Sequence, residues 1–192
     1  MSLFRTSSNA IAEWPVPAEF QPQRLLRALV AHDVDFVVIG GLAGMARGSA
    51  YPSYDLDIAY ARNDENLEAL VGALIDVDAR LRGAPPDVPF LLDAKTLRNG
   101  SNFTFATPWG SLDIIGEAPG APSYERLRDA AGARVAIEGE LVSVASLDHL
   151  IAMKEAAGRP KDKLMATEYR VLSDELRAPR DSAGGAAQDE QP

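Results

Sequence analysis

Cysteine is absent from the 192 residues of this chain. Its absence excludes disulfide bonds, thiolate nucleophiles and zinc–thiolate sites. Histidine is almost as scarce, with only His32 and His149, so a metal site built from several histidines is not expected. Catalytic or metal-binding chemistry must therefore come from other side chains.

Long apolar runs and an excess of positive charge are missing too. Nowhere do about 18 apolar residues follow one another, and no basic segment leads into an apolar run at the N-terminus. We therefore expect no signal peptide, no membrane span and a cytoplasmic location. The net charge of -9 and the pI near 4.7 argue against indiscriminate nucleic-acid binding, although a local basic groove is compatible with both values.

The length corresponds to about one domain, and a hydrophobic content of 46% is enough to build its core. Residues 1–20 lack clear periodicity and are interpreted as an N-terminal arm. Residues 21–145 form the expected core domain, and residues 146–178 are expected to be helices that complete its site. Residues 179–192 are small and polar, which predicts a disordered tail.

Hydrophobic periodicity and turn residues predict interleaved helices and strands, and hence an α/β or α+β sheet domain. Ser123 and Ser146 are expected to cap the helices that follow them, and Gly158 to end the second of these. Helices are expected over residues 22–32, 42–45, 66–81, 123–131, 147–157 and 160–176. Strands are expected over residues 36–39, 54–60, 103–105, 112–115, 135–137 and 141–144, the last two as a hairpin.

The most informative pattern is a glycine pair after an apolar strand, followed by an Asp-x-Asp on the next strand. Gly40 and Gly41 leave room for a phosphate to approach backbone N–H groups, although a tight strand-to-helix turn would also use them. Asp55 and Asp57 share one strand face because strand side chains alternate with a period of two. Two Mg²⁺ ions roughly 3.5–4 Å apart would neutralise such a pair and activate an attacking hydroxyl. A solvated strand face is the alternative.

A two-metal site normally needs a third carboxylate from a neighbouring strand, and Asp113 is the best candidate. It interrupts the apolar run Leu112-Asp113-Ile114-Ile115, where an unpaired carboxylate would be costly to bury. An outward-facing position on an edge strand is the alternative. A ligand position opposite Asp55 and Asp57 explains the placement better.

These motifs together resemble the signature of the polymerase-beta-like nucleotidyltransferase superfamily: Gly40-Gly41, a gap of about a dozen residues, Asp55-Leu56-Asp57, and Asp113 on a later strand. The resemblance implies a mixed sheet flanked by helices, with further helices at the C-terminus. The segments 146–154 and 158–162 resemble later motifs of the AbiEii-like branch, which includes the MenT-type toxins. In that branch a lysine and a following aspartate complete the active site, which implies Lys154 and Asp162.

The resemblance implies transfer of a nucleoside monophosphate from an NTP to an acceptor hydroxyl, with two Mg²⁺ ions and release of pyrophosphate. Asp55, Asp57 and Asp113 would hold the metals, and Asp113 would help to deprotonate the acceptor. The triphosphate would be bound by Gly40, Gly41 and Ser53 and neutralised by Lys154. From the residues alone, Lys154 could instead extend its amine to water, and Asp162 could simply favour a helix N-terminus.

Arg159, Lys161 and Lys163 surround the same region with positive charge, and this patch could receive an RNA end. The resemblance implies the 3′ end of tRNA as acceptor, and a growth-arresting toxin restrained by a cognate antitoxin protein. An aminoglycoside-type drug or a partner protein is the alternative acceptor. A non-catalytic partner-binding module of the same fold is the alternative from outside the enzymes.

Overall fold

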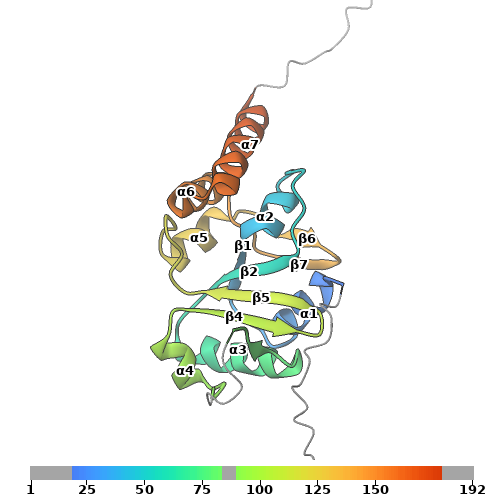
Figure 1. Cartoon of the computed structure of the whole chain (residues 1–192), viewed down its shortest axis with the longest axis vertical. Coiled ribbons are helices and arrows are strands. Elements are labelled where there is room, and N and C mark those ends of the chain that lie inside the picture. Colours follow the sequence, from blue (N-terminus) through green and yellow to red (C-terminus); the bar gives the residue numbers. More distant parts are fainter. Residues whose placement is uncertain (1–18, 84–89, 179–192) are drawn as a thin grey trace, which may run out of the picture.

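The computed structural model describes residues 19–83 and 90–178. Residues 1–18 of the expected arm, most of the loop expected around Gly83 to Pro86, and the expected tail from residue 179 lie outside the described residues. The remainder folds around a mixed five-stranded sheet in the order β1-β2-β5-β4-β3 (Figure 1). The strands are β1 (Phe36–Ile39), β2 (Asp55–Tyr60), β3 (Arg80–Leu81), β4 (Asn102–Thr107) and β5 (Gly110–Ile115). A separate hairpin pairs β6 (Val135–Ile137) with β7 (Glu140–Val142).

Only β2 and β5 run parallel among the paired strands of the five-stranded sheet. Their inner side chains, including Leu56, Ile58, Leu112 and Ile114, are at most 1% exposed and form the centre of the core. The burial of alternate residues fixes the register of this pair, because a slip of one residue would expose the whole apolar set. The polar residues between them consequently face the opposite side of the sheet.

The helices cover the sheet unevenly. In Figure 1, α3 and α4 lie at one end of the molecule, and α6 and α7 lie at the other, beyond α2. The helices are α1 (Pro22–Ala31), α2 (Gly40–Ala46), α3 (Asp64–Asp76), α4 (Ala94–Asn99), α5 (Tyr124–Ala130), α6 (Leu147–Ala157) and α7 (Pro160–Arg177).

Local sequence signals account for most of the helix boundaries. Asn63 accepts a hydrogen bond from the Asn66 amide at the start of α3, and Ser146 accepts one from the His149 amide at the start of α6. Gly158 ends α6 in the left-handed conformation (φ 69°), and Pro160 then occupies the first turn of α7. Within the described residues, no helix is both long and apolar enough to cross a bilayer.

Three expectations about secondary structure are corrected. The helix expected over 66–81 ends at Asp76, because Asp78 adopts a positive φ of 47° and the chain then forms β3 along β4. The short helix α4, begun by Asp93, was not expected. Ser123 stands at the start of α5 but makes no capping hydrogen bond through its side chain.

Candidate active site

The register between β2 and β5 brings the proposed metal ligands to one face of the sheet. Asp57 lies directly opposite Asp113 in the parallel pair, and Asp55 is two residues earlier on the same face. Because β5 lies between β2 and β4, Asp113 is on an interior strand and not at a sheet edge. Asp55, Asp57 and Asp113 all line one cavity of about 560 Å³.

Among the three carboxylates, Asp57 has the most strongly raised pKa. Burial and the negative charges of Asp55 and Asp113 together raise its pKa to about 7, against the opposite effect of Lys154. Burial also raises the pKa of Asp113, against the effect of the neighbouring Arg82. Carboxylates that resist ionisation in this way are the ones that a bound cation would stabilise most.

The glycine pair packs against these carboxylates. Gly40 begins α2 with a φ of 67°, and a side chain there would overlap the Asp57 carboxylate. The Gly41 amide donates a hydrogen bond to Asp57, and a side chain at Gly41 would overlap Ser53. Ser53 in turn donates to Asp55 Oδ1 over 3.0 Å. The two glycines therefore permit a backbone approach that no other residue allows.

The opposite wall of the cavity comes from α6 and α7. Lys154 Nζ lies 3.1 Å from Asp162 Oδ1, and Arg159 Nε lies 2.6 Å from Asp162 Oδ2. The Asp162 side chain is only 3% exposed. Burial alone would raise its pKa, but the hydrogen bonds and charges of Arg159 and Lys154 prevail and lower it. Asp162 is thus an anionic anchor that holds two cations at the cavity.

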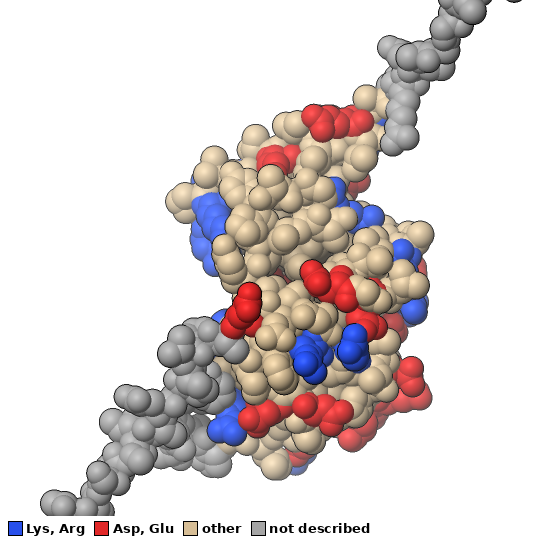
Figure 2. Space-filling model, turned by 90° about the vertical axis from the view of Figure 1, so that its right-hand side faces the viewer, with Lys and Arg blue, Asp and Glu red and all other residues tan. Residues whose placement is uncertain are grey.

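Lys161 also lines the cavity, whereas Lys163 is exposed on α7 and does not. On the face shown in Figure 2, Lys, Arg, Asp and Glu side chains are interspersed and form no continuous basic surface. The positive charge at the cavity itself comes from four side chains: Arg82, Lys154, Arg159 and Lys161.

Arg82 belongs to the site and was missed by the sequence analysis. Its Nη2 lies 3.3 Å from both Asp113 oxygens, and its Nη1 donates to Ser111 Oγ over 2.9 Å. It lines the same cavity. A lone arginine next to a turn gives no sequence signal, and only the β3–β4–β5 pairing brings it to Asp113.

The carboxylates suit a hard divalent cation, because Mg²⁺ prefers oxygen ligands. The repulsion among the three carboxylates also favours a cation, and it contributes to the raised pKa of Asp57. As they stand, no three acidic or histidine side chains of the described residues converge closely enough to hold a metal ion. Each of the three carboxylates already has a partner: Ser53 binds Asp55, the Gly41 amide binds Asp57 and Arg82 binds Asp113. A metal would have to exchange with these contacts.

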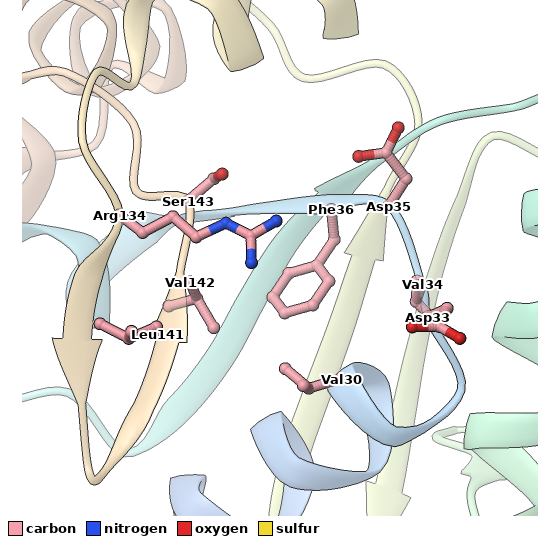
Figure 3. A pocket seen from close by; sticks show the side chains of 9 residues that line it. All are labelled: Val30, Asp33, Val34, Asp35, Phe36, Arg134, Leu141, Val142 and Ser143. Carbon is pink, nitrogen blue, oxygen red and sulfur yellow. The ribbon is translucent and has the colours of Figure 1, made fainter.

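A second cavity of about 240 Å³ lies beside the beginning of β1, facing the β6–β7 hairpin (Figure 3). The charged residues that line this cavity are Asp33, Asp35 and Arg134. The Asp35 carboxylate accepts a hydrogen bond of 2.7 Å from the Tyr124 hydroxyl and pairs with Arg128. These contacts link α5 to β1 and identify Asp35 as structural, so the larger cavity is the candidate active site.

Solved structures with the same architecture are nucleotidyl-transferring proteins. ANT(2")-Ia, in complex with adenylyl-2"-tobramycin, matches with a TM-score of 0.53 and 16% identity over 81% of this chain and 87% of its own. The lincosamide antibiotic adenylyltransferase LnuA, with lincomycin bound, matches with a TM-score of 0.52 and 12% identity over 80% of this chain and 99% of its own. No family model and no curated protein matches the chain. The chain therefore has the nucleotidyltransferase fold, which confirms the expected fold class.

Proposed function

We propose that this protein transfers a nucleoside monophosphate from an NTP to an acceptor hydroxyl and releases pyrophosphate. The observation that carries the proposal is the register of β2 and β5, which places Asp55, Asp57 and Asp113 along one wall of a cavity opposite Lys154. The volume of about 560 Å³ is in the range of small-molecule sites. The shared fold with two adenylyl-transferring proteins supports the same reaction class.

In the proposed reaction, the acceptor oxygen forms a bond to the α-phosphorus of the NTP. The bond from that phosphorus to the bridging oxygen breaks, and pyrophosphate leaves with the electron pair. The acceptor proton passes to a carboxylate of the site, for which Asp113 is our candidate. Divalent metal, held by Asp55, Asp57 and Asp113, would activate the attacking oxygen and stabilise the leaving group.

The remaining residues would bind the triphosphate. Gly40 and Gly41 provide a backbone surface free of side chains, and Ser53 provides a hydroxyl beside it. Lys154 would neutralise the triphosphate from the opposite wall, in an orientation that Asp162 fixes. Asp162 would act as a positioning residue, since its own carboxylate is buried beneath Lys154 and Arg159.

We further propose that the acceptor is RNA, in particular the 3′ end of tRNA. Arg159 and Lys161 line the cavity, and Lys163 extends the same charge along the exposed side of α7. Together with the resemblance of residues 146–162 to the AbiEii-like branch, this favours a toxin that a cognate antitoxin restrains. Modification of tRNA would be the means of growth arrest.

An antibiotic is the second candidate acceptor. The specific observation in its favour is that two proteins of the same fold were solved with an adenylylated aminoglycoside and with a lincosamide. The exposed Tyr54 and the neighbouring Pro52 and Met153 give this cavity an apolar side that such a molecule could occupy.

Labelled NTPs distinguish the two acceptors. The protein would be incubated with Mg²⁺ and each of the four NTPs labelled at the α-phosphate, with total RNA in one series and with tobramycin or lincomycin in the other. We expect label in RNA of tRNA length and none in the drugs. Label in a drug and not in RNA would transfer the proposal to the second candidate, and no label in any acceptor would contradict the proposed reaction.

A further inference from the structure

The position of Arg82 next to Asp113 has consequences for how the site fills. The backbone amide of Arg82 donates to Thr104 on β4 over 2.8 Å, which continues the β3–β4 pairing by one residue. Thr104 is itself paired with Asp113 on β5. The Arg82 side chain therefore crosses β4 on the cavity face and meets both oxygens of Asp113.

The contact engages the same oxygens that a cation would need. Arg82 Nη2 donates to both Asp113 oxygens over 3.3 Å, and a guanidinium stays protonated at every physiological pH. Asp113 cannot offer both oxygens to Arg82 and also serve as a full metal ligand. In the substrate-free protein, Arg82 is therefore a competitor of the metal at the third carboxylate.

The two partners differ in their freedom to move. The Asp113 side chain is 15% exposed and belongs to an interior strand, whereas the Arg82 side chain is 45% exposed and lies near the end of the short β3. A long, half-exposed side chain gains rotational freedom on release, and exposed ion pairs are weak. Arg82, and not Asp113, is the partner that would leave when a cation binds.

A released Arg82 would remain beside the cavity, whose lining also includes Lys154 and Arg159. Planar guanidinium groups bind phosphate oxygens through two hydrogen bonds, which makes a triphosphate its natural second partner. We propose that Arg82 is a substrate-binding residue that exchanges partners: it holds Asp113 in the empty site and moves to the NTP phosphates when metal and NTP enter. This inference rests on the proposed function.

The exchange is tested by binding measurements without turnover. In Arg82→Gln, the competitor for Asp113 is lost, so Mn²⁺ measured by electron paramagnetic resonance without nucleotide should bind about 2–5-fold more tightly than in the wild type. A non-hydrolysable NTP analogue with Mn²⁺ should bind about 10–100-fold more weakly, because a charge-assisted phosphate contact is lost. Arg82→Lys, which keeps the charge without the fork, should bind the analogue with intermediate affinity.

Arg98→Gln is the matched control, since Arg98 pairs with Asp64 and has a nearly equal exposed fraction of 47%. It does not line the cavity, and neither affinity should change. If Mn²⁺ and the analogue bind Arg82→Gln as they bind the wild type, the exchange is wrong while the proposed function stands. If the wild type itself neither binds Mn²⁺ nor transfers label, the proposed function fails, and the inference fails with it.

Discussion

Asp57 shows how a single side chain connects the fold to the chemistry. It is half-buried against Gly40, accepts a hydrogen bond from the Gly41 amide and lies opposite Asp113 in the strand pair. Its pKa near 7 shows that the charged form of this carboxylate is unfavourable in the folded protein. Active sites commonly concentrate such perturbed groups, because the arrangement that binds a cation is unfavourable without it.

The raised pKa predicts how stability depends on pH. Asp57 holds its proton to about pH 7 in the folded protein but loses it near pH 3.8 when unfolded. Between these values the folded state binds more protons, so the free energy of unfolding falls as the pH rises from about 4 to about 7, and this group adds no further change above pH 7. Asp57→Asn should remove about 2–4 kcal/mol of that fall.

Urea unfolding in EDTA at a series of pH values measures the effect. The wild type and Asp57→Asn should be similar in stability near pH 4, and the variant should be the more stable one at pH 8. Addition of Mg²⁺ at pH 8 should stabilise the wild type more than the variant. Parallel pH curves for the two proteins would show that Asp57 ionises normally.

Residue patterns predicted the carboxylates and most of the cations of the site, but not the contacts that hold them in place. Asp55 and Asp57 were predictable because strand alternation is a local property. The pairing of Asp57 with Asp113 depends on the register of two strands that are separated by residues 61–109 of the chain. The shared need to bury Leu56, Ile58, Leu112 and Ile114 sets this register. Arg82 could not be found locally at all, since its role depends on reaching across β4.

Among the secondary-structure elements, α2 and α7 both contribute residues to the cavity, and they pack together through Gly44 and Tyr169. Tyr169 of α7 is fully buried, and its ring and hydroxyl lie where a side chain at Gly44 of α2 would be. The absence of a side chain at Gly44 therefore sets how closely α7 approaches the helix that begins with Gly40.

Gly44→Ala should accordingly destabilise the protein, although alanine is the better helix former. Overpacking against the fully buried Tyr169 is expected to cost about 1–3 kcal/mol, which exceeds the gain of up to about 1 kcal/mol from helix propensity. In a Tyr169→Phe background the loss should shrink, because the overlapping hydroxyl is removed. A urea-unfolding cycle of the four proteins measures this coupling, and additive effects would contradict the contact.

Local signals predicted the bounds of α6, whereas tertiary pairing set the end of α3. Ser146 and Gly158 bound α6 as expected, because capping and the left-handed turn need only nearby backbone groups. The apolar spacing of residues 66–81 continued the helix too far, since the pairing of Arg80 and Leu81 with β4 determines the conformation there. The resemblance to known motifs supplied the mixed sheet that periodicity alone did not specify.

For the molecule as a whole, the central contrast is between its net charge and its site. The chain carries a net charge of -9, yet Lys154, Arg159 and Lys161 meet at one cavity. The cavity lining as a whole holds four cations and four carboxylates, so an anionic substrate is repelled less there than by the acidic chain as a whole.

Lys161→Glu tests whether this local charge binds RNA. If Lys161 contacts an RNA phosphate, the variant should modify RNA more slowly, and the slope of log affinity against log salt should decrease by nearly one unit because fewer counterions are released. Binding of the NTP should be almost unchanged. Lys95→Glu, the same charge change on the exposed side of α4, is the control and should behave as the wild type. Equal slopes and rates for Lys161→Glu and the wild type would exclude Lys161 from the RNA site.

The most direct test of nucleotidyl transfer follows the two ends of the triphosphate separately. The wild type and Asp57→Ala would be incubated with total RNA, Mg²⁺ and NTP labelled at either the α- or the γ-phosphate. For the wild type, we expect α-label bound covalently to the acceptor and γ-label released as pyrophosphate. For a folded Asp57→Ala we expect neither. Transfer of γ-label to the acceptor, an unlabelled acceptor with the wild type, or equal α-labelling by the variant would contradict the proposed reaction at this site.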